Sequence, residues 1–143
     1  MRKLGVALAA LGVVLSGFAS TGPARGDQDA AVTTTTATMT CDRVESPGRV
    51  RCEVEARVGA GEAINWGDVV ILKTPPFASA LRGRIGPHDA TLHDPGVWRW
   101  ALALVAREKG GGDVEGRVRL VVCKGDRCGP REIDVKGRMQ VGD

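Results

Sequence analysis

Cysteines are the residues of this 143-residue chain with the most chemistry to offer. The four are Cys41, Cys52, Cys123 and Cys128. A bridge between Cys123 and Cys128 would close a very small loop, which removes less chain entropy than a long-range bridge does. Lys124 and Arg127 flank the two sulfurs and would favour a thiolate. This pair therefore predicts either a labile, exchanging disulfide or a static clip on a surface hairpin.

The start of the chain has the pattern of a secretory signal peptide. Arg2 and Lys3 precede the apolar run Leu4–Leu15, and small residues follow. The run is too short to span a bilayer, which needs about 20 apolar residues. We expect signal and cleavage region over residues 1–26, a flexible lead-in over 27–40, and one domain over 41–143. The product should be periplasmic or secreted, with no membrane span in the mature protein.

Charge excludes one class of partner. The chain has 20 Lys and Arg against 17 Asp and Glu. Three of the basic residues, Arg2, Lys3 and Arg25, lie in the predicted signal, so the mature part carries 17 of each sign. A general nucleic-acid binder needs a basic excess to displace counterions. We therefore expect no nucleic-acid binding. Separately, we expect a monomer.

An exported chain with an even number of cysteines is expected to form disulfides, and four cysteines allow three pairings. The segment Arg49–Val58 alternates apolar and charged residues, which predicts a strand with Cys52 on its buried face.

A turn signal over residues 45–48 precedes this strand. A four-residue loop there would place Val44 opposite Arg49 and Cys41 opposite Cys52. Directly opposed residues lie close enough for a bridge. The register therefore predicts a structural disulfide between Cys41 and Cys52.

Further strand patterns follow along the chain, separated by glycine and proline turns. They are Val69–Lys73, Leu81–Ile85, Val97–Arg107, Val114–Lys124 and Glu132–Val141. Residues 76–96 otherwise look irregular. The segment Val97–Arg107 also fits a helix, capped by Asp94, with Pro95 in its first turn. We favour a strand that pairs with Val114–Lys124 across a Gly110–Gly112 loop. The predicted fold is all-β, an immunoglobulin-like antiparallel β-sandwich.

An alternative pairing joins Cys52 to Cys123, with Trp66 between them in the order of an immunoglobulin core bridge. Two observations disfavour it. Val121 stands where the corner tyrosine of that fold would be. Cys123 also points to the opposite face of its strand from Val118 and its apolar neighbours, so a core bridge would need a bulge.

The region around the second cysteine pair resembles the N-terminal periplasmic domain of DsbD-type thiol:disulfide interchange proteins. The matching residues are Gly116, Val118, Leu120, Cys123, Cys128 and Pro130. The resemblance implies that Cys128 exchanges with partners and that Cys123 is its mate. It also implies a periplasmic thioredoxin-like protein or a membrane electron carrier as partner. The family's aromatic cap has no clear counterpart, since the chain lacks Tyr and Phe77 is the only Phe after the signal.

These observations predict an exported thiol-disulfide exchange module with catalytic Cys123 and Cys128. The alternative is a non-catalytic binding or structural domain that the disulfides only stabilise. His88-Asp89 and His93-Asp94 form a pattern that could bind a divalent metal. Such loop residues more often form turns, and we expect neither a metal nor a cofactor.

Overall fold

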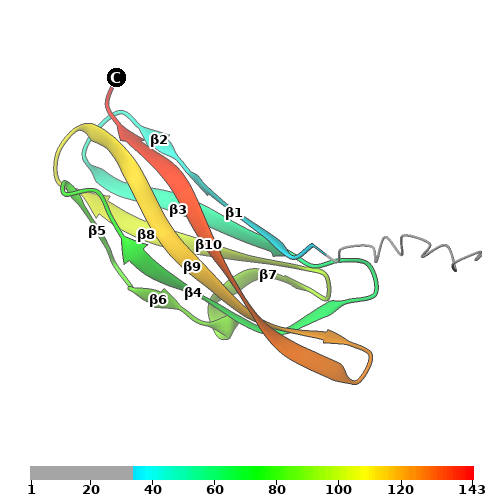
Figure 1. Cartoon of the computed structure of the whole chain (residues 1–143). Coiled ribbons are helices and arrows are strands. Elements are labelled where there is room, and N and C mark those ends of the chain that lie inside the picture. The colour runs from blue at the N-terminus through cyan, green and yellow to red at the C-terminus, as the bar shows by residue number, and fades with distance from the viewer. Residues whose placement is uncertain (1–33) are drawn as a thin grey trace, which may run out of the picture.

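The computed structural model describes residues 34–143, which form strands almost throughout (Figure 1). The strands are β1 (Thr36–Cys41), β2 (Arg43–Val44), β3 (Gly48–Arg57), β4 (Ala63–Lys73), β5 (Ala78–Ala80), β6 (Arg84–Ile85), β7 (Ala90–Asp94), β8 (Val97–Ala106), β9 (Gly110–Lys124) and β10 (Arg127–Val141). One 3₁₀ turn, Pro87–Asp89, stands between β6 and β7.

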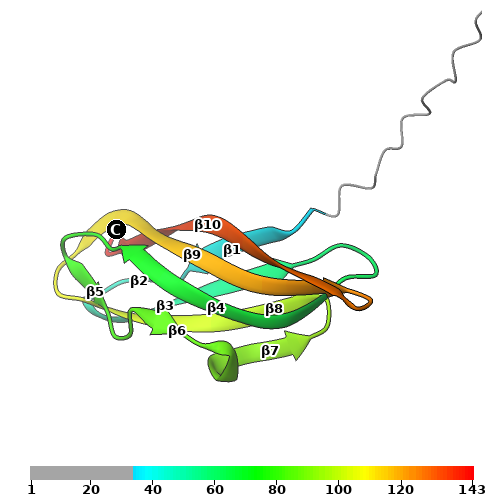
Figure 2. The ribbon, with the colours of Figure 1, turned by 60° about the horizontal axis from the view of Figure 1, so that its bottom comes forward.

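The strands build two sheets that face each other (Figure 2). Sheet A has the order β1-β3-β8-β5, and β7 also pairs with β8. Sheet B has the order β2-β10-β9-β4-β6. The pairs are antiparallel except for the short pair of β2 with β10, which is parallel. The fold is an immunoglobulin-like antiparallel β-sandwich, as the sequence predicts.

Alternation along the long strands explains the core. Side chains of a strand point to opposite faces in turn, so every second residue faces the other sheet. On β8 the buried residues are Trp98, Trp100, Leu102, Leu104 and Ala106. On β9 they include Val114, Val118, Leu120 and Val122. The strand prediction for residues 97–107 is therefore confirmed and the helical alternative is wrong.

The predicted pairing of these two segments is wrong, because β8 lies in sheet A and β9 in sheet B. Gly110–Gly112 is the start of β9 rather than a loop, and the turn falls at residues 107–109. The glycines are needed because the chain after β4 packs onto them. A Cβ on Gly112 would lie 2.8 Å from Pro75 carbons, and one on Gly110 would lie 3.0 Å from the Phe77 ring.

The N-terminal edge also differs from expectation. Residues 36–40, expected in a flexible lead-in, belong to β1, and β1 pairs with β3 in the predicted register of Cys41 opposite Cys52. The hairpin does not continue, however. After Asp42 the chain crosses to sheet B, where Val44 pairs with Val141 and not with Arg49. The segment that holds β1 and β2 thus provides an edge strand to each of the two sheets.

A similar crossing occupies the stretch expected to be irregular. The chain runs alongside β8 as β5, leaves to pair with β4 as β6, and returns to β8 as β7. The predicted edge strand Leu81–Ile85 shrinks to Arg84–Ile85. The predicted signal peptide lies outside the described residues. Within residues 34–143 we find no helix with the length and apolar character needed to cross a membrane.

Candidate functional site

The structure contains the two disulfides that the sequence predicts. Cys41 is bonded to Cys52, with Cα atoms 3.9 Å apart, and Cys123 to Cys128, with Cα atoms 4.0 Å apart. Both join directly opposed residues of neighbouring antiparallel strands. The alternative bridge between Cys52 and Cys123 is therefore excluded.

The Cys123–Cys128 disulfide lies at the end of the long β9–β10 hairpin (Figure 1). Residues 124–127 close the hairpin, with Gly125 at φ +62°, a conformation that glycine adopts without strain. Val122, one position before Cys123, is buried in the core. Because neighbours on a strand point to opposite faces, the disulfide lies on the outward face of sheet B. Cys128 is exposed and Cys123 half-buried.

The Cys41–Cys52 disulfide is in a different environment. Cys52 has no exposed surface and faces the interior between the equally buried Val50 and Val54. Cys41, on the edge strand β1, is half-buried and packs against the core. This pair joins β1 to β3 where solvent does not reach Cys52.

Cys128 also lies on β10, whose flank away from β9 runs beside β1 from Arg131 onward, where Arg131 donates a hydrogen bond to Thr35. On the side away from β9, the strand pairing of β10 within residues 34–143 is limited to Gln140 and Val141, with β2. Cys123 has a covered flank instead, because Ala63 of β4 is its neighbour in the register. The two sulfurs therefore differ in the direction from which a reagent can approach.

Charged groups surround this end of the sandwich. Lys124 and Arg127 are exposed and pair with each other in the strand register beyond the disulfide, with side chains on the opposite face of the hairpin from the two sulfurs. Next to Ala63, the nearly buried Glu62 accepts hydrogen bonds from Arg131 at 2.7 and 3.0 Å. The hydrogen bonds from Arg131 lower the pKa of Glu62, with a smaller effect from the charge of Lys124. Glu62 is thus held as a carboxylate near Lys124.

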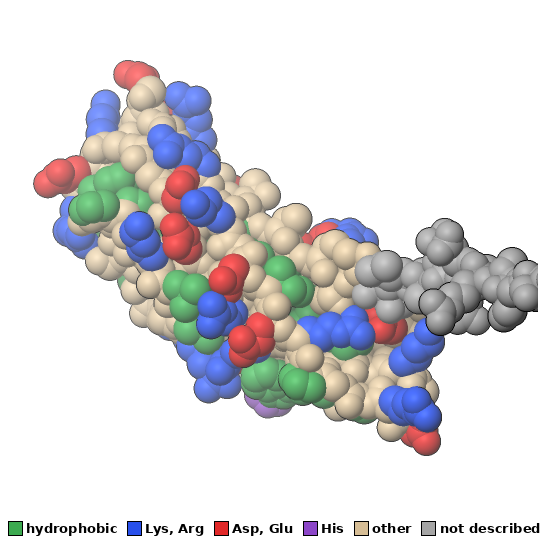
Figure 3. Space-filling view, in the orientation of Figure 1, with side chains coloured by type: hydrophobic (Ala, Val, Ile, Leu, Met, Phe, Trp, Pro, Cys, Tyr) green, Lys and Arg blue, Asp and Glu red, His purple; other side chains and the backbone are tan. Residues whose placement is uncertain are grey.

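Two rows of uncharged residues cross sheet B around the disulfide, and we call them the neutral rows. The register aligns Pro130, Val121 and Trp66 in one row and Cys128, Cys123 and Ala63 in the other. The next outward row toward the other end of the sheet is Glu132, Arg119 and Asp68, followed by rows with Asp134 and Arg117, and with Lys136 and Glu115. Figure 3 shows basic and acidic side chains interspersed along this face.

Asp68 is a buried charge that the sequence analysis missed. Its neighbours Gly67 and Val69 face the core, so Asp68 lies on the outward face, yet it has no exposed surface. Arg119 and Arg84 cover it and donate hydrogen bonds to its carboxylate. An aspartate inside an otherwise apolar strand was the available signal.

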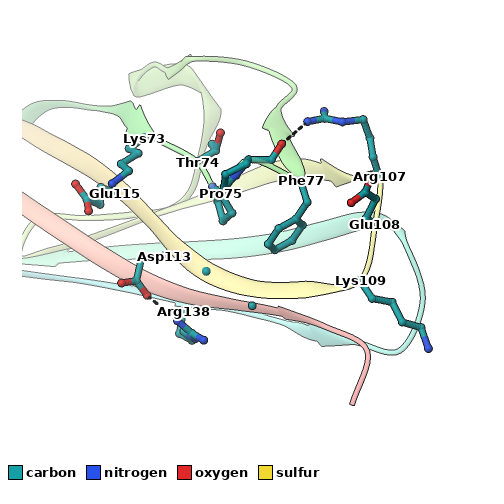
Figure 4. Close-up of a pocket in the computed structure, with 13 residues that line it drawn as sticks. Lys73, Thr74, Pro75, Phe77, Arg107, Glu108, Lys109, Asp113, Glu115 and Arg138 are labelled. Carbon is teal, nitrogen blue, oxygen red and sulfur yellow. Dashed lines mark hydrogen bonds and ion pairs between the residues drawn. The ribbon is translucent and has the colours of Figure 1, made fainter.

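Phe77 does not cap the disulfide. It lines a cleft of about 570 Å³ at the opposite end of the sandwich, together with Pro75 and the basic residues Lys73, Arg107, Lys109 and Arg138 (Figure 4). The ring lies against Gly110, thirteen positions before Cys123 on β9, which corresponds to about 40 Å. The disulfide therefore lacks the cap that the family resemblance would supply from this residue.

The two histidines lie in different surroundings. His88 lies in the 3₁₀ turn, while His93 stacks edge-on against Trp98 with ring centroids 3.7 Å apart. Asp89 is paired with Arg82. Over the described range, no three His, Cys, Asp or Glu residues lie close enough to hold a metal ion.

Comparison with known proteins finds no matching family model and no matching curated protein. Solved structures that match do so at low identity and with TM-scores below 0.5. A PapD-like domain of human CEP192 covers 78% of this chain and 88% of its own, at 10% identity and a TM-score of 0.36. AggA, the major subunit of Escherichia coli aggregative adherence fimbriae type I, covers 76% of this chain and 95% of its own, at 10% identity and a TM-score of 0.39. The seventh ScaB type I cohesin of Pseudobacteroides cellulosolvens covers 73% of this chain and 91% of its own, at 14% identity and a TM-score of 0.38. At these identities and TM-scores we draw no conclusion about this chain from the likeness.

Proposed function

We propose that the protein is an exported thiol-disulfide exchange module whose Cys123–Cys128 pair passes reducing equivalents between partners. The observation that carries this proposal is the exposure of Cys128 on the outward face of sheet B. Reactive disulfides must be reachable by a partner thiolate, whereas structural ones are usually shielded. Cys41–Cys52, with its fully buried Cys52, serves as the structural pair. The two disulfides and the signal-like N-terminus support export.

The exchange step assigns different roles to the two sulfurs. A partner thiolate attacks Cys128, a bond forms between the two sulfurs, and the Cys123–Cys128 bond breaks. Cys123 leaves as a thiolate and takes a proton from water. A second thiol of the partner then attacks the partner's own sulfur in the mixed disulfide and releases Cys128. The module ends with two thiols and the partner with a disulfide.

The partner that fits this step is a dithiol protein, such as a periplasmic thioredoxin-like protein or a membrane electron carrier. The second candidate function is a binding or structural domain with two static disulfides. One observation favours that alternative: Cys123 and Cys128 are opposed residues of a continuous, regularly paired hairpin, so their bridge also works as a clip.

Titration of the protein against a thiol redox buffer separates the two functions. The redox function expects the Cys123–Cys128 pair to be reduced well above about −300 mV, where structural disulfides of secreted proteins stay oxidised. It also expects Cys123→Ser to trap a mixed disulfide through Cys128. If both pairs remain oxidised and no adduct forms, the structural alternative holds.

A further inference from the structure

We propose that the neutral rows select the partner: the reactive thiol of the partner stands in an uncharged, apolar surface that docks across Pro130, Val121 and Trp66. This inference rests on the proposed exchange at Cys128. It adds what the partner must look like around its sulfur, which the presence of a disulfide alone does not specify.

The first step of the argument is the change of charge along sheet B. Over three strands, the six outward positions of the neutral rows carry no charge, and the row that follows carries Glu132, Arg119 and Asp68. Trp66 and Val121 remain half-buried and Pro130 exposed. The border between uncharged and charged surface therefore falls one outward row beyond Pro130, on the strand that holds Cys128.

The second step is the geometry of exchange. Attack on a disulfide sulfur is nearly collinear with the bond that breaks, so a thiolate reaches Cys128 from the side opposite Cys123. The new bond holds the partner's sulfur about 2 Å from that of Cys128. Outward neighbours along a strand are about 7 Å apart and adjacent strands about 4.8 Å apart. Residues on either side of the partner's sulfur are then within reach of Pro130, the next outward residue of β10, and of Val121 beside it.

The third step is the cost of burying unlike groups. A charged partner residue placed on the neutral rows would lose water and gain no counter-charge. An apolar residue would be stabilised there, because it covers Val121, Pro130 and the Trp66 ring. Tryptophan is also frequent at the centres of protein interfaces. Uncharged surface against uncharged surface is thus the complementary arrangement, with charged rows at its border.

The test uses two blocked cysteine peptides of equal length as reductants of the oxidised protein. One carries leucine and tryptophan around its cysteine, and the other carries serine and glutamine, so neither brings a charge. The rate constant of mixed-disulfide formation at Cys128 is measured by mass spectrometry, and dithiothreitol reports the intrinsic reactivity of the disulfide. We expect the apolar peptide to react at least tenfold faster than the polar one.

Two variants locate the effect. Val121→Glu places a charge in the neutral rows and should bring the ratio of the two peptide rates close to one. Leu72→Glu places the same charge at the half-exposed Leu72, near the other end of sheet B, and should leave the ratio unchanged. The ratio of the two rate constants compares two neutral peptides on the same protein. Any effect of the substitution on the stability of the leaving Cys123 thiolate changes both rate constants alike and cancels in the ratio.

The outcomes are distinct. Equal rates for both peptides on the unaltered protein overturn the docking inference while exchange itself stands. A rate preference that survives Val121→Glu also overturns it, because the selecting surface then lies elsewhere. If neither the peptides nor dithiothreitol reduces the pair, the proposed function fails and this inference fails with it. A dimer that protects Cys128 from reaction would make a second copy the occupant and overturn it as well.

Discussion

Asp68 lies beneath Arg119, whose Nε donates a hydrogen bond of 2.8 Å to one carboxylate oxygen. Arg84 donates another of 2.6 Å from β6 to the second oxygen. The carboxylate thus joins three strands, β4, β9 and β6, at a point where it has no exposed surface. A buried charge with two partners in place is costly to disturb, because the remaining groups lose their counter-charge.

Asp68→Asn keeps the size of the side chain and removes its charge. We expect a loss of about 2–3 kcal/mol in the free energy of unfolding, below the value for a fully buried pair because both arginines are partly exposed. Urea unfolding at pH 7 measures it. Asp134→Asn, in the exposed pair with Arg117, is the matched control and should cost far less. Equal losses would contradict the distinction.

The same carboxylate predicts a dependence on pH. Burial raises the pKa of Asp68, but the hydrogen bonds from Arg119 and Arg84 outweigh it and the pKa lies below its ordinary value. A group whose pKa is lowered by folding stabilises the fold at pH values above its pKa in the unfolded chain. It loses that contribution as the pH falls through its pKa in the folded chain. We expect stability to fall below about pH 4, and to fall less steeply in Asp68→Asn. Parallel pH profiles would refute this prediction.

Accessibility predicts the order in which the disulfides react. With limiting reductant and a thiol-alkylating reagent, Cys123 and Cys128 should be labelled first, because Cys128 is exposed and Cys52 has no exposed surface. Peptide mapping by mass spectrometry gives the order. Labelling of Cys41 and Cys52 at the same rate would show that burial does not protect the inner pair.

Gly112→Ala should destabilise the protein by about 1–3 kcal/mol, because the new Cβ would lie 2.8 Å from Pro75. Gly129→Ala, also in a strand but with no atom within 4 Å of the new Cβ, is the control. It should be neutral or slightly stabilising, since glycine weakens a strand. Thermal unfolding of both variants checks the prediction, and an unaffected Gly112→Ala protein would contradict it.

Trp100→Phe should cost about 2–3 kcal/mol. The indole of the fully buried Trp100 donates a hydrogen bond of 3.2 Å to the carbonyl of Gly86, next to the 3₁₀ turn. Phenylalanine leaves that carbonyl without its donor and leaves a gap in the core. Trp66→Phe, at the half-buried surface position, should change stability much less. Chemical denaturation compares the two.

Alternation of apolar and polar residues was enough to predict β3, β8, β9 and the buried faces of each. It could not predict which strands pair, because a two-residue period shows which face is buried and not which neighbour lies alongside. Hence β8 and β9 were expected as partners although they lie in different sheets. Gly110–Gly112 resembled a loop because the reason for the glycines, the packing of Pro75 and Phe77, comes from a distant segment.

For the candidate site, spacing and strand register predicted both disulfides. The neutral rows could not be predicted, since they combine residues from β4, β9 and β10 whose alignment includes a bulge between Ile64 and Trp66. Asp68 likewise depends on arginines 16 and 51 residues away in the chain. Local pattern cannot anticipate such contacts.

The two crossings between sheets lie on opposite sides of the sandwich. On one side β1 and β2 belong to different sheets, and on the other β6 leaves the sheet that holds β5 and β7. Neither sheet can unfold without disturbing the other, because each is joined to the other by a crossing segment on both sides. The described domain should therefore unfold in one cooperative transition. Amide hydrogens at the centres of both sheets should then exchange with the same opening free energy, which global unfolding sets.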